Sequence, residues 1–112
     1  MSKYDLYLND ILRAVELIEK SIGNISYNEF ELNQDLIDAT AMRLQIIGES
    51  IKKLPAKFKQ NKKIKWKDLQ ELRNIISHAY FRINAQIVFD TIKNYLPELK
   101  QEIKKLKSTL IT

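Results

Sequence analysis

The sequence contains no cysteine, and only two glycines and two prolines occur among its 112 residues. Without cysteine there is no disulfide, no thiolate metal ligand and no cysteine nucleophile, which suits a reducing cytoplasm. Average usage at this length would give roughly eight glycines and about five prolines, so turn residues are scarce. This scarcity argues against a β-sandwich or a β-barrel. No glycine-rich phosphate loop of the G-x-x-x-x-G-K or G-x-G-x-x-G type occurs either.

Long hydrophobic runs are also missing. No uninterrupted apolar stretch approaches the roughly 18 residues that a membrane-spanning helix needs. The first five residues carry charges and precede no apolar run, so we expect no signal peptide. Hydrophobic residues make up 45% of the chain and charged residues 29%, a composition typical of globular proteins. We therefore expect a soluble, cytoplasmic protein without a membrane partner, folded as one domain over residues 1–112.

Hydrophobic residues recur at helical spacing along the whole chain. The pattern predicts helices over residues 3–21 and 28–53, a third from about Trp66 and a fourth from about Asn84, which is a plausible N-cap. Pro97 lies inside the fourth helix and is expected to kink or split it. The predicted fold is all-α, an up-down bundle of four to five helices with short connections.

The second predicted helix is apolar on two sides. One stripe consists of Thr40, Leu44, Ile47, Ile51 and Leu54, and an adjoining side carries Leu32, Ala39, Met42 and Ile46. Gly48 lies within this helix, where close approach of another helix is the usual compensation for its low helix propensity. So broad an apolar surface indicates burial against the core and against a second subunit, so we expect a homodimer.

Charge is concentrated in the middle of the chain, although the net charge is only +5. Residues 50–67 contain no acidic residue and eight lysines: Lys52, Lys53, Lys57, Lys59, Lys62, Lys63, Lys65 and Lys67. Such a lysine block is a candidate binding patch for a polyanion. It is equally well explained as a solvated connection that lysine keeps soluble.

A polar run interrupts the third predicted helix between Arg73 and Tyr80, and it contains the only histidine, His78. No acidic residue stands four positions from His78, so a metal site there has no credible ligand set. Arg73 and His78 lie roughly 140° apart on an ideal helix. They can act on one phosphate only if the helix ends near His78 or if two subunits share the site. The alternative is that Arg73 pairs with Glu71 or Asp68 and that His78 caps a helix end.

Two segments carry a family resemblance. The stretch W-K-D-L-Q-E-L-R-N-I-I-S-H-A-Y-F-R-I-N contains the pattern R-x4-H-x-Y and is followed by Y-L-P-E-L. It resembles the short HEPN toxins of the HepT type, and M-R-L-Q-I-I-G-E-S-I-K-K-L-P at 42–55 is similar to the second-helix signature of that family. The resemblance implies an all-helical, metal-independent endoribonuclease without a cofactor, whose paired motifs line a cleft between two subunits. It also implies an antitoxin, an MNT-type minimal nucleotidyltransferase that adds AMP to the motif tyrosine, here Tyr80.

The residue types fit this chemistry. Metal-free RNA cleavage uses the 2′-hydroxyl as an internal nucleophile and needs a proton-transfer group that titrates near neutrality, as histidine does. It also needs a permanent cation on the phosphate, where the planar fork of arginine is suited. We therefore assign His78 as general acid/base and Arg73 as phosphate clamp, with Asn74 and Ser77 in supporting positions.

The remaining candidates are RNA contacts. The lysine block and Arg82 would hold the backbone of an RNA such as a tRNA or an mRNA, in a salt-dependent way. Tyr80, Phe81 and Arg82 offer faces on which bases can stack. A second hypothesis stays open, namely that the chain is a non-catalytic helical module that binds a nucleotidyltransferase.

Overall fold

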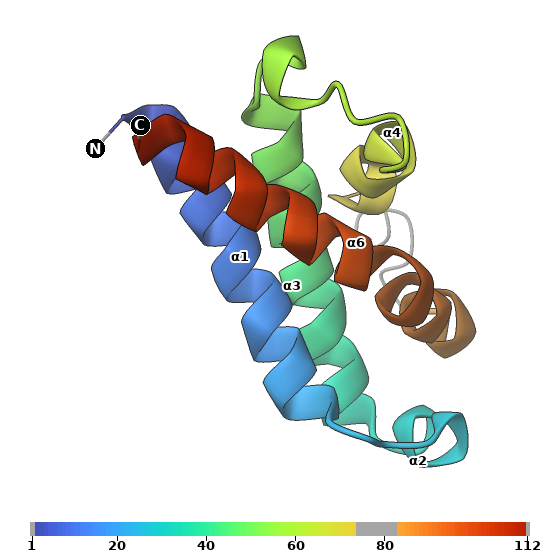
Figure 1. The fold of residues 1–112 in the computed structure, drawn as a ribbon. Coiled ribbons are helices and arrows are strands. Elements are labelled where there is room, and N and C mark those ends of the chain that lie inside the picture. Colours follow the sequence, from blue (N-terminus) through green and yellow to red (C-terminus); the bar gives the residue numbers. More distant parts are fainter. Residues whose placement is uncertain (1, 74–82, 112) are drawn as a thin grey trace.

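The computed structural model describes residues 2–73 and 83–111 and is built from helices (Figure 1). Its elements are α1 (Lys3–Ile22), α2 (Tyr27–Glu31), α3 (Gln34–Lys53), the 3-10 turn η1 (Ala56–Phe58), α4 (Trp66–Gln70), the 3-10 turn η2 (Glu71–Arg73) and α6 (Ala85–Ile111). Within the described residues there is no β-strand. The prediction of an all-α fold is confirmed.

The core forms where α1, α3 and α6 meet. Helices α1 and α3 pack against each other in opposite directions, and the second half of α6 crosses both of them (Figure 1). The apolar stripe of α1 is completely or almost completely buried: Leu8, Ile11, Val15, Ile18 and Ile22. Its spacing of three and four residues places these side chains on one face, toward α3 and α6. The boundaries predicted for this helix are confirmed to within one residue.

The single helix predicted over residues 28–53 is wrong, because two helices occupy this stretch. The short α2 begins after Ser26, which forms a reciprocal capping box with Glu29. The chain then breaks at Leu32, and Asn33 caps α3 by accepting a hydrogen bond from the Leu36 N–H at 3.1 Å. Each cap satisfies amide donors that otherwise lack a partner at a helix start. These local caps override the continuous apolar pattern that suggested one helix.

The fourth predicted helix is confirmed as α6, with Asn84 as its N-cap. The Asn84 side chain accepts from the Ile87 N–H at 3.1 Å. Pro97 does not split α6, which is continuous from Ala85 to Ile111. Figure 1 shows that the first turns of α6 run in a different direction from the rest, so the helix bends instead. A proline ring clashes with the carbonyl four residues earlier, which explains such a bend.

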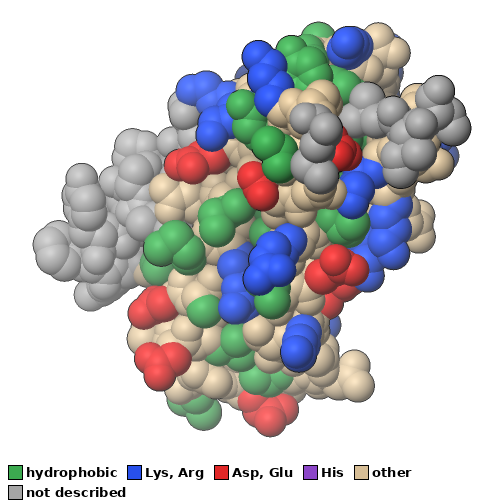
Figure 2. All heavy atoms as spheres, turned by 90° about the vertical axis from the view of Figure 1, so that its left-hand side faces the viewer, with side chains coloured by type: hydrophobic (Ala, Val, Ile, Leu, Met, Phe, Trp, Pro, Cys, Tyr) green, Lys and Arg blue, Asp and Glu red, His purple; other side chains and the backbone are tan. Residues whose placement is uncertain are grey.

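Helix α3 is apolar on two sides, as predicted, but the described residues bury only one of them. The stripe from Thr40 to Leu54 is buried, and α3 packs against α1, α4 and η2, with a smaller contact to α6. On the adjoining side Met42 is 55% exposed and Ile46 is 40% exposed, one helical turn apart. Figure 2 shows the left-hand face of the molecule, where hydrophobic side chains emerge in patches among charged ones. Leu32 is 85% exposed and belongs to the break before α3, so it does not extend this surface.

Candidate functional site

The structure describes the entry and the exit of the polar motif. The third predicted helix begins at Trp66 as expected, but α4 ends at Gln70 and continues as η2 up to Arg73. Leu69 and Leu72 are buried, and both α4 and η2 pack against α3. The motif therefore begins at a backbone position, Arg73, that the core holds in place. Two residues separate its end, Tyr80, from Ile83, which precedes the capped start of α6.

Most of the predicted residues of the motif site lie outside the described residues. These are Asn74, Ser77, His78, Tyr80, Phe81 and Arg82, all within 74–82. The roles assigned to them, and the alternative that His78 caps a helix end, stay predictions. The same holds for the ion pair of Arg73 with Glu71 or Asp68, because the structure describes only the backbone of Arg73.

The lysine block does not form one uniform patch. Lys52 and Lys53 lie in the last turn of α3, Lys57 lies in η1, and Lys67 lies in α4. Lys59 is partly buried, and its Nζ donates a hydrogen bond to the Ile51 carbonyl at 3.2 Å. Burial lowers the pKa of the Lys59 ammonium. Lys59 thus satisfies a carbonyl at the end of α3 and serves the fold rather than an external anion.

Two further lysines lie over aromatic rings. The Nζ of Lys53 is 5.5 Å from the ring centre of Tyr7, and the Nζ of Lys57 is 5.8 Å from that of Tyr4. Tyr4 also packs against Phe58, with ring centres 5.5 Å apart. Such cation–π contacts orient the ammonium groups without neutralising their charge. Within the lysine block, the exposed lysines for which no such contact is seen among the described residues are Lys52, Lys62, Lys63, Lys65 and Lys67.

Asn61 fixes the loop that carries the central lysines. Its side-chain Nδ2 donates to Glu102 Oε1 of α6 at 2.7 Å, and its Oδ1 accepts from the Lys63 N–H at 3.0 Å. Its backbone carbonyl accepts from the Trp66 Nε1–H at 3.0 Å. Glu102 is only 8% exposed. These bonds hold the loop against α6, so Lys63 projects from a rigid support rather than from a mobile linker.

Sequence reasoning missed the basic contribution of α6. Lys105 lies far from the lysine block in the sequence, but it shares a groove with Lys57, Lys63 and Asn61. The sequence gives only a weak indication of this contribution, because the net charge of residues 68–112 is only +2. Only the contact between the loop and α6, some forty residues apart in the chain, brings these cations together.

Two kinds of feature are absent from the described residues. No three histidine, cysteine, aspartate or glutamate side chains of residues 2–73 and 83–111 come together as a metal site. None of the helices in those same residues has the length and apolar character that crossing a membrane requires.

The sequence matches a family model over most of its length. Residues 11–106 match the family described as "Ribonuclease HepT-like". No solved structure gives a significant match.

Individual curated proteins are also similar. The chain is 34% identical over 102 residues to "Probable ribonuclease HepT" of Thermococcus cleftensis, covering 90% of this chain and 93% of that protein. It is 34% identical over 101 residues to "Putative RNase TTE0752" of Caldanaerobacter subterraneus subsp. tengcongensis, covering 89% and 90%. It is 37% identical over 106 residues to the Methanocaldococcus jannaschii protein named "Gamma-glutamylcyclotransferase and putative RNase MJ0434". That match covers 94% of this chain but spans only about half, 48%, of the relative.

Proposed function

Because this chain belongs to the ribonuclease HepT-like family, we propose that it is a metal-independent endoribonuclease and the toxin of a toxin–antitoxin pair. The observation that carries the proposal is the match over residues 11–106, which includes the whole R-x4-H-x-Y motif from Arg73 to Tyr80. Two relatives that cover about nine-tenths of the chain bear RNase names. The anchored η2 supports the proposal, because it holds the first motif residue against the core.

The proposed reaction is an internal phosphoryl transfer. The 2′-hydroxyl of the RNA attacks the adjacent phosphorus, and the 5′-oxygen of the next nucleotide leaves. His78 takes the proton from the 2′-hydroxyl or delivers one to the leaving oxygen. Arg73 stabilises the negative charge that builds on the phosphate, where a bidentate guanidinium is favoured over a point charge. Asn74 orients His78 or the phosphate, and Ser77 takes a supporting position.

Cleavage is expected to survive an excess of EDTA, because no step needs a metal ion. The measurement is the cleavage of single-stranded RNA by purified protein, with and without EDTA. The chelator suppresses contaminating metal-dependent nucleases, and His78→Ala purified in the same way controls for metal-independent ones. Activity that vanishes with EDTA and returns with magnesium would contradict the mechanism. No cleavage under either condition would favour the second hypothesis, a non-catalytic partner of a nucleotidyltransferase.

We further propose that the active form is a homodimer that uses the uncovered side of α3. Met42 and Ile46 are exposed there, and Ile46 lines a hollow between α1 and α3 together with Leu17 and Arg43. A dimer through this side and the motif region would bring two motifs into one cleft. It would also resolve the roughly 140° separation of Arg73 and His78, since each could come from a different subunit.

Ile46→Asp and Met42→Asp are each expected to weaken dimerisation at least about tenfold, because an unpaired charge in an apolar interface is strongly unfavourable. Sedimentation measured over a range of protein concentrations gives the dissociation constant. Leu32→Asp is the matched control, since Leu32 is exposed but lies outside α3. A wild-type protein that sediments as a compact monomer at micromolar concentration would contradict the proposal.

The proposed antitoxin is an MNT-type nucleotidyltransferase, and the proposed modification site is Tyr80. Its support is the R-x4-H-x-Y pattern, in which Tyr80 follows His78 by two residues. An adenylyl group on this tyrosine adds negative charge and bulk beside the phosphate clamp, and both oppose RNA binding.

A further inference from the structure

A polar groove lies between the loop of residues 57–64 and the second half of α6, and we call it the loop–α6 groove. It consists of two adjoining hollows of about 350 Å³ and about 460 Å³. Four side chains line both hollows: Asn61, Lys63, Glu102 and Lys105. Hollows of this size are common for small ligands.

The loop–α6 groove is built to keep its shape. The hydrogen bond of 2.7 Å from Asn61 Nδ2 to Glu102 Oε1 joins its two walls. Glu102 is more than nine-tenths buried. The bonds of Asn61 to the Lys63 N–H and to the Trp66 indole fix the loop on its other side. A rigid wall lowers the conformational entropy that a ligand must remove on binding.

Three kinds of groups line the groove, and two of them together match a nucleotide. Lys57, Lys63 and Lys105 provide cations, which suit a phosphate. Glu98 and the amide of Gln101 provide acceptors, which suit the exocyclic amino groups of bases. The apolar side chains Phe58 and Leu106 line only the other hollow, away from Glu98 and Gln101, and bound the groove there. The carboxylates of an acidic peptide cannot donate hydrogen bonds to Glu98 and Gln101, whereas the amino groups of a base can, so a nucleotide fits better.

We propose that the loop–α6 groove holds one unpaired nucleotide of the RNA substrate, outside the motif that cleaves it. Lys63 and Lys105 contact its phosphate, and the base lies toward Glu98 and Gln101. The inference rests on the proposed ribonuclease function and deepens it. It assigns the substrate class as single-stranded RNA that is long enough to reach both the R-x4-H-x-Y motif and the loop–α6 groove. Between Lys63 and Arg73 the chain runs through α4 and η2, so the two places are separate but linked by one short segment.

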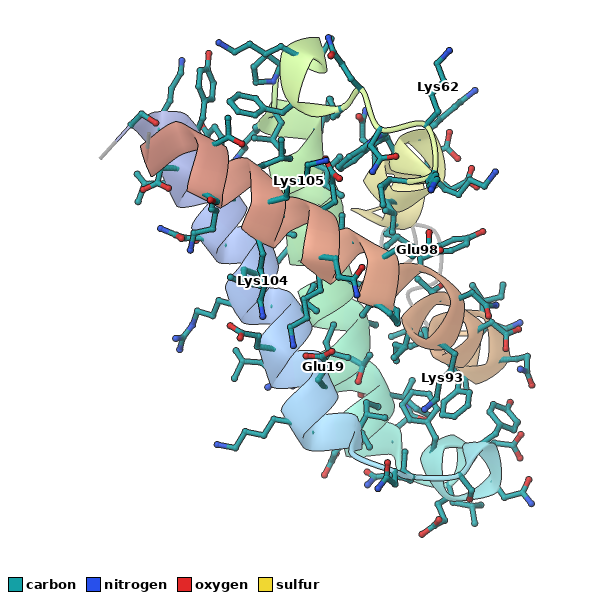
Figure 3. The ribbon with its side chains drawn as sticks, viewed as in Figure 1. Glu19, Lys62, Lys93, Glu98, Lys104 and Lys105 are labelled. Atoms are coloured by element: carbon teal, nitrogen blue, oxygen red, sulfur yellow. The ribbon has the colours of Figure 1, made fainter. Side chains whose placement is uncertain are left out.

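The chain offers matched controls for this proposal. Lys104 and Lys105 are neighbours on α6 and both are exposed, but only Lys105 lines the groove. Figure 3 shows Lys104 on the side of α6 toward α1 and Lys62 pointing away from the molecule. Lys62 and Lys63 are likewise exposed neighbours in the lysine block, but only Lys63 lines the groove, so the proposal places an RNA contact on Lys63 and none on Lys62. Charge reversal within each pair changes the net charge equally and differs only in position.

The test compares Lys63→Glu and Lys105→Glu with Lys62→Glu and Lys104→Glu. Steady-state cleavage is measured on a dinucleotide and on a single-stranded RNA of about 20 nucleotides, longer than typical single-strand sites of roughly 4–16 nucleotides. The groove variants should raise KM for the long RNA about tenfold with little change in kcat. Each should lower the slope of log affinity against log salt by about 1. The control variants should stay near the wild type, and no variant should affect the dinucleotide.

The outcomes separate the two proposals. An equal rise in KM for the long RNA in groove and control variants would mean that RNA binding depends only on the overall charge. That result would overturn the loop–α6 groove as a site. Unchanged KM in Lys63→Glu and Lys105→Glu would overturn it as well, while the wild-type activity keeps the ribonuclease proposal intact. If the wild type cleaves neither substrate, the ribonuclease proposal itself fails. Circular dichroism melting of all four variants verifies that these exposed positions leave the fold unchanged.

Discussion

Replacing His78 with alanine is expected to reduce RNA cleavage by about 100- to 10,000-fold, the usual contribution of a general acid–base group. His78 is the only histidine of the chain, so no other imidazole can take over its proton transfer. The helical fold is expected to stay intact in this variant. The measurement combines initial cleavage rates with thermal unfolding of both proteins.

His78→Gln separates this role from a structural one. Glutamine can donate and accept hydrogen bonds but does not titrate near neutrality. If His78 only caps a helix end, glutamine should restore much of the activity that alanine loses. Proton transfer predicts that both variants are equally inactive. Full activity in His78→Ala, in protein free of other nucleases, would remove His78 from the mechanism.

Arg73→Lys provides a companion measurement for the phosphate clamp. Lysine keeps the charge but loses the planar fork that bonds two phosphate oxygens at once. We expect a loss of about 100- to 1,000-fold in kcat, comparable to removing one preorganised donor from the transition state. Cleavage by Arg73→Lys at the wild-type rate would show that a point charge suffices.

The second large effect concerns Tyr80. Co-expression with an active nucleotidyltransferase partner should relieve the toxicity of the chain expressed alone, and intact mass should increase by one or more adenylyl groups. The modified protein is expected to cleave RNA at least about 100-fold more slowly, because the added phosphate neutralises Arg73 and the nucleotide fills the cleft. The measurement is intact-mass spectrometry followed by a cleavage assay on the same sample.

Tyr80→Phe is the matched variant, since it lacks only the phenolic oxygen that would carry AMP. It should show no mass increment and should stay toxic in the presence of the partner. If Tyr80→Phe still gains adenylyl groups, the modification lies on another residue. If the modified wild type cleaves RNA at the unmodified rate, the modification does not inhibit by this route.

The helices could be predicted from the sequence where one apolar stripe faces one core. The stripe from Leu8 to Ile22 and the stripe from Thr40 to Leu54 both specify buried faces, and both are buried. The break between α2 and α3 was missed because apolar residues continue through it. The signals that decide it are local and polar, namely the Ser26–Glu29 capping box and the Asn33 cap. Reading S-x-x-E as a helix start would have revealed the first of them.

The lysine block shows what the sequence could not resolve. Eight lysines in one run suggest a single patch, yet Lys59 binds the Ile51 carbonyl and two others lie over tyrosine rings. The roles of these lysines depend on neighbours from α1 and α6, which lie far from them in the sequence. Lys105 joins Lys63 only because Asn61 bonds to Glu102 across 41 positions. Charge counting finds the region, and only tertiary contacts distinguish its members.

The central claim is that this chain cleaves RNA by internal attack of the 2′-hydroxyl, and the chemical ends of its products test it most directly. Purified wild-type protein is incubated in EDTA with a single-stranded RNA of defined sequence, and the fragments are identified by mass spectrometry, with His78→Ala as the blank. The account predicts 5′-hydroxyl fragments paired with 2′,3′-cyclic phosphates or the 3′-phosphates formed by their hydrolysis. Fragments with 3′-hydroxyl and 5′-phosphate ends, produced only with magnesium, would contradict it.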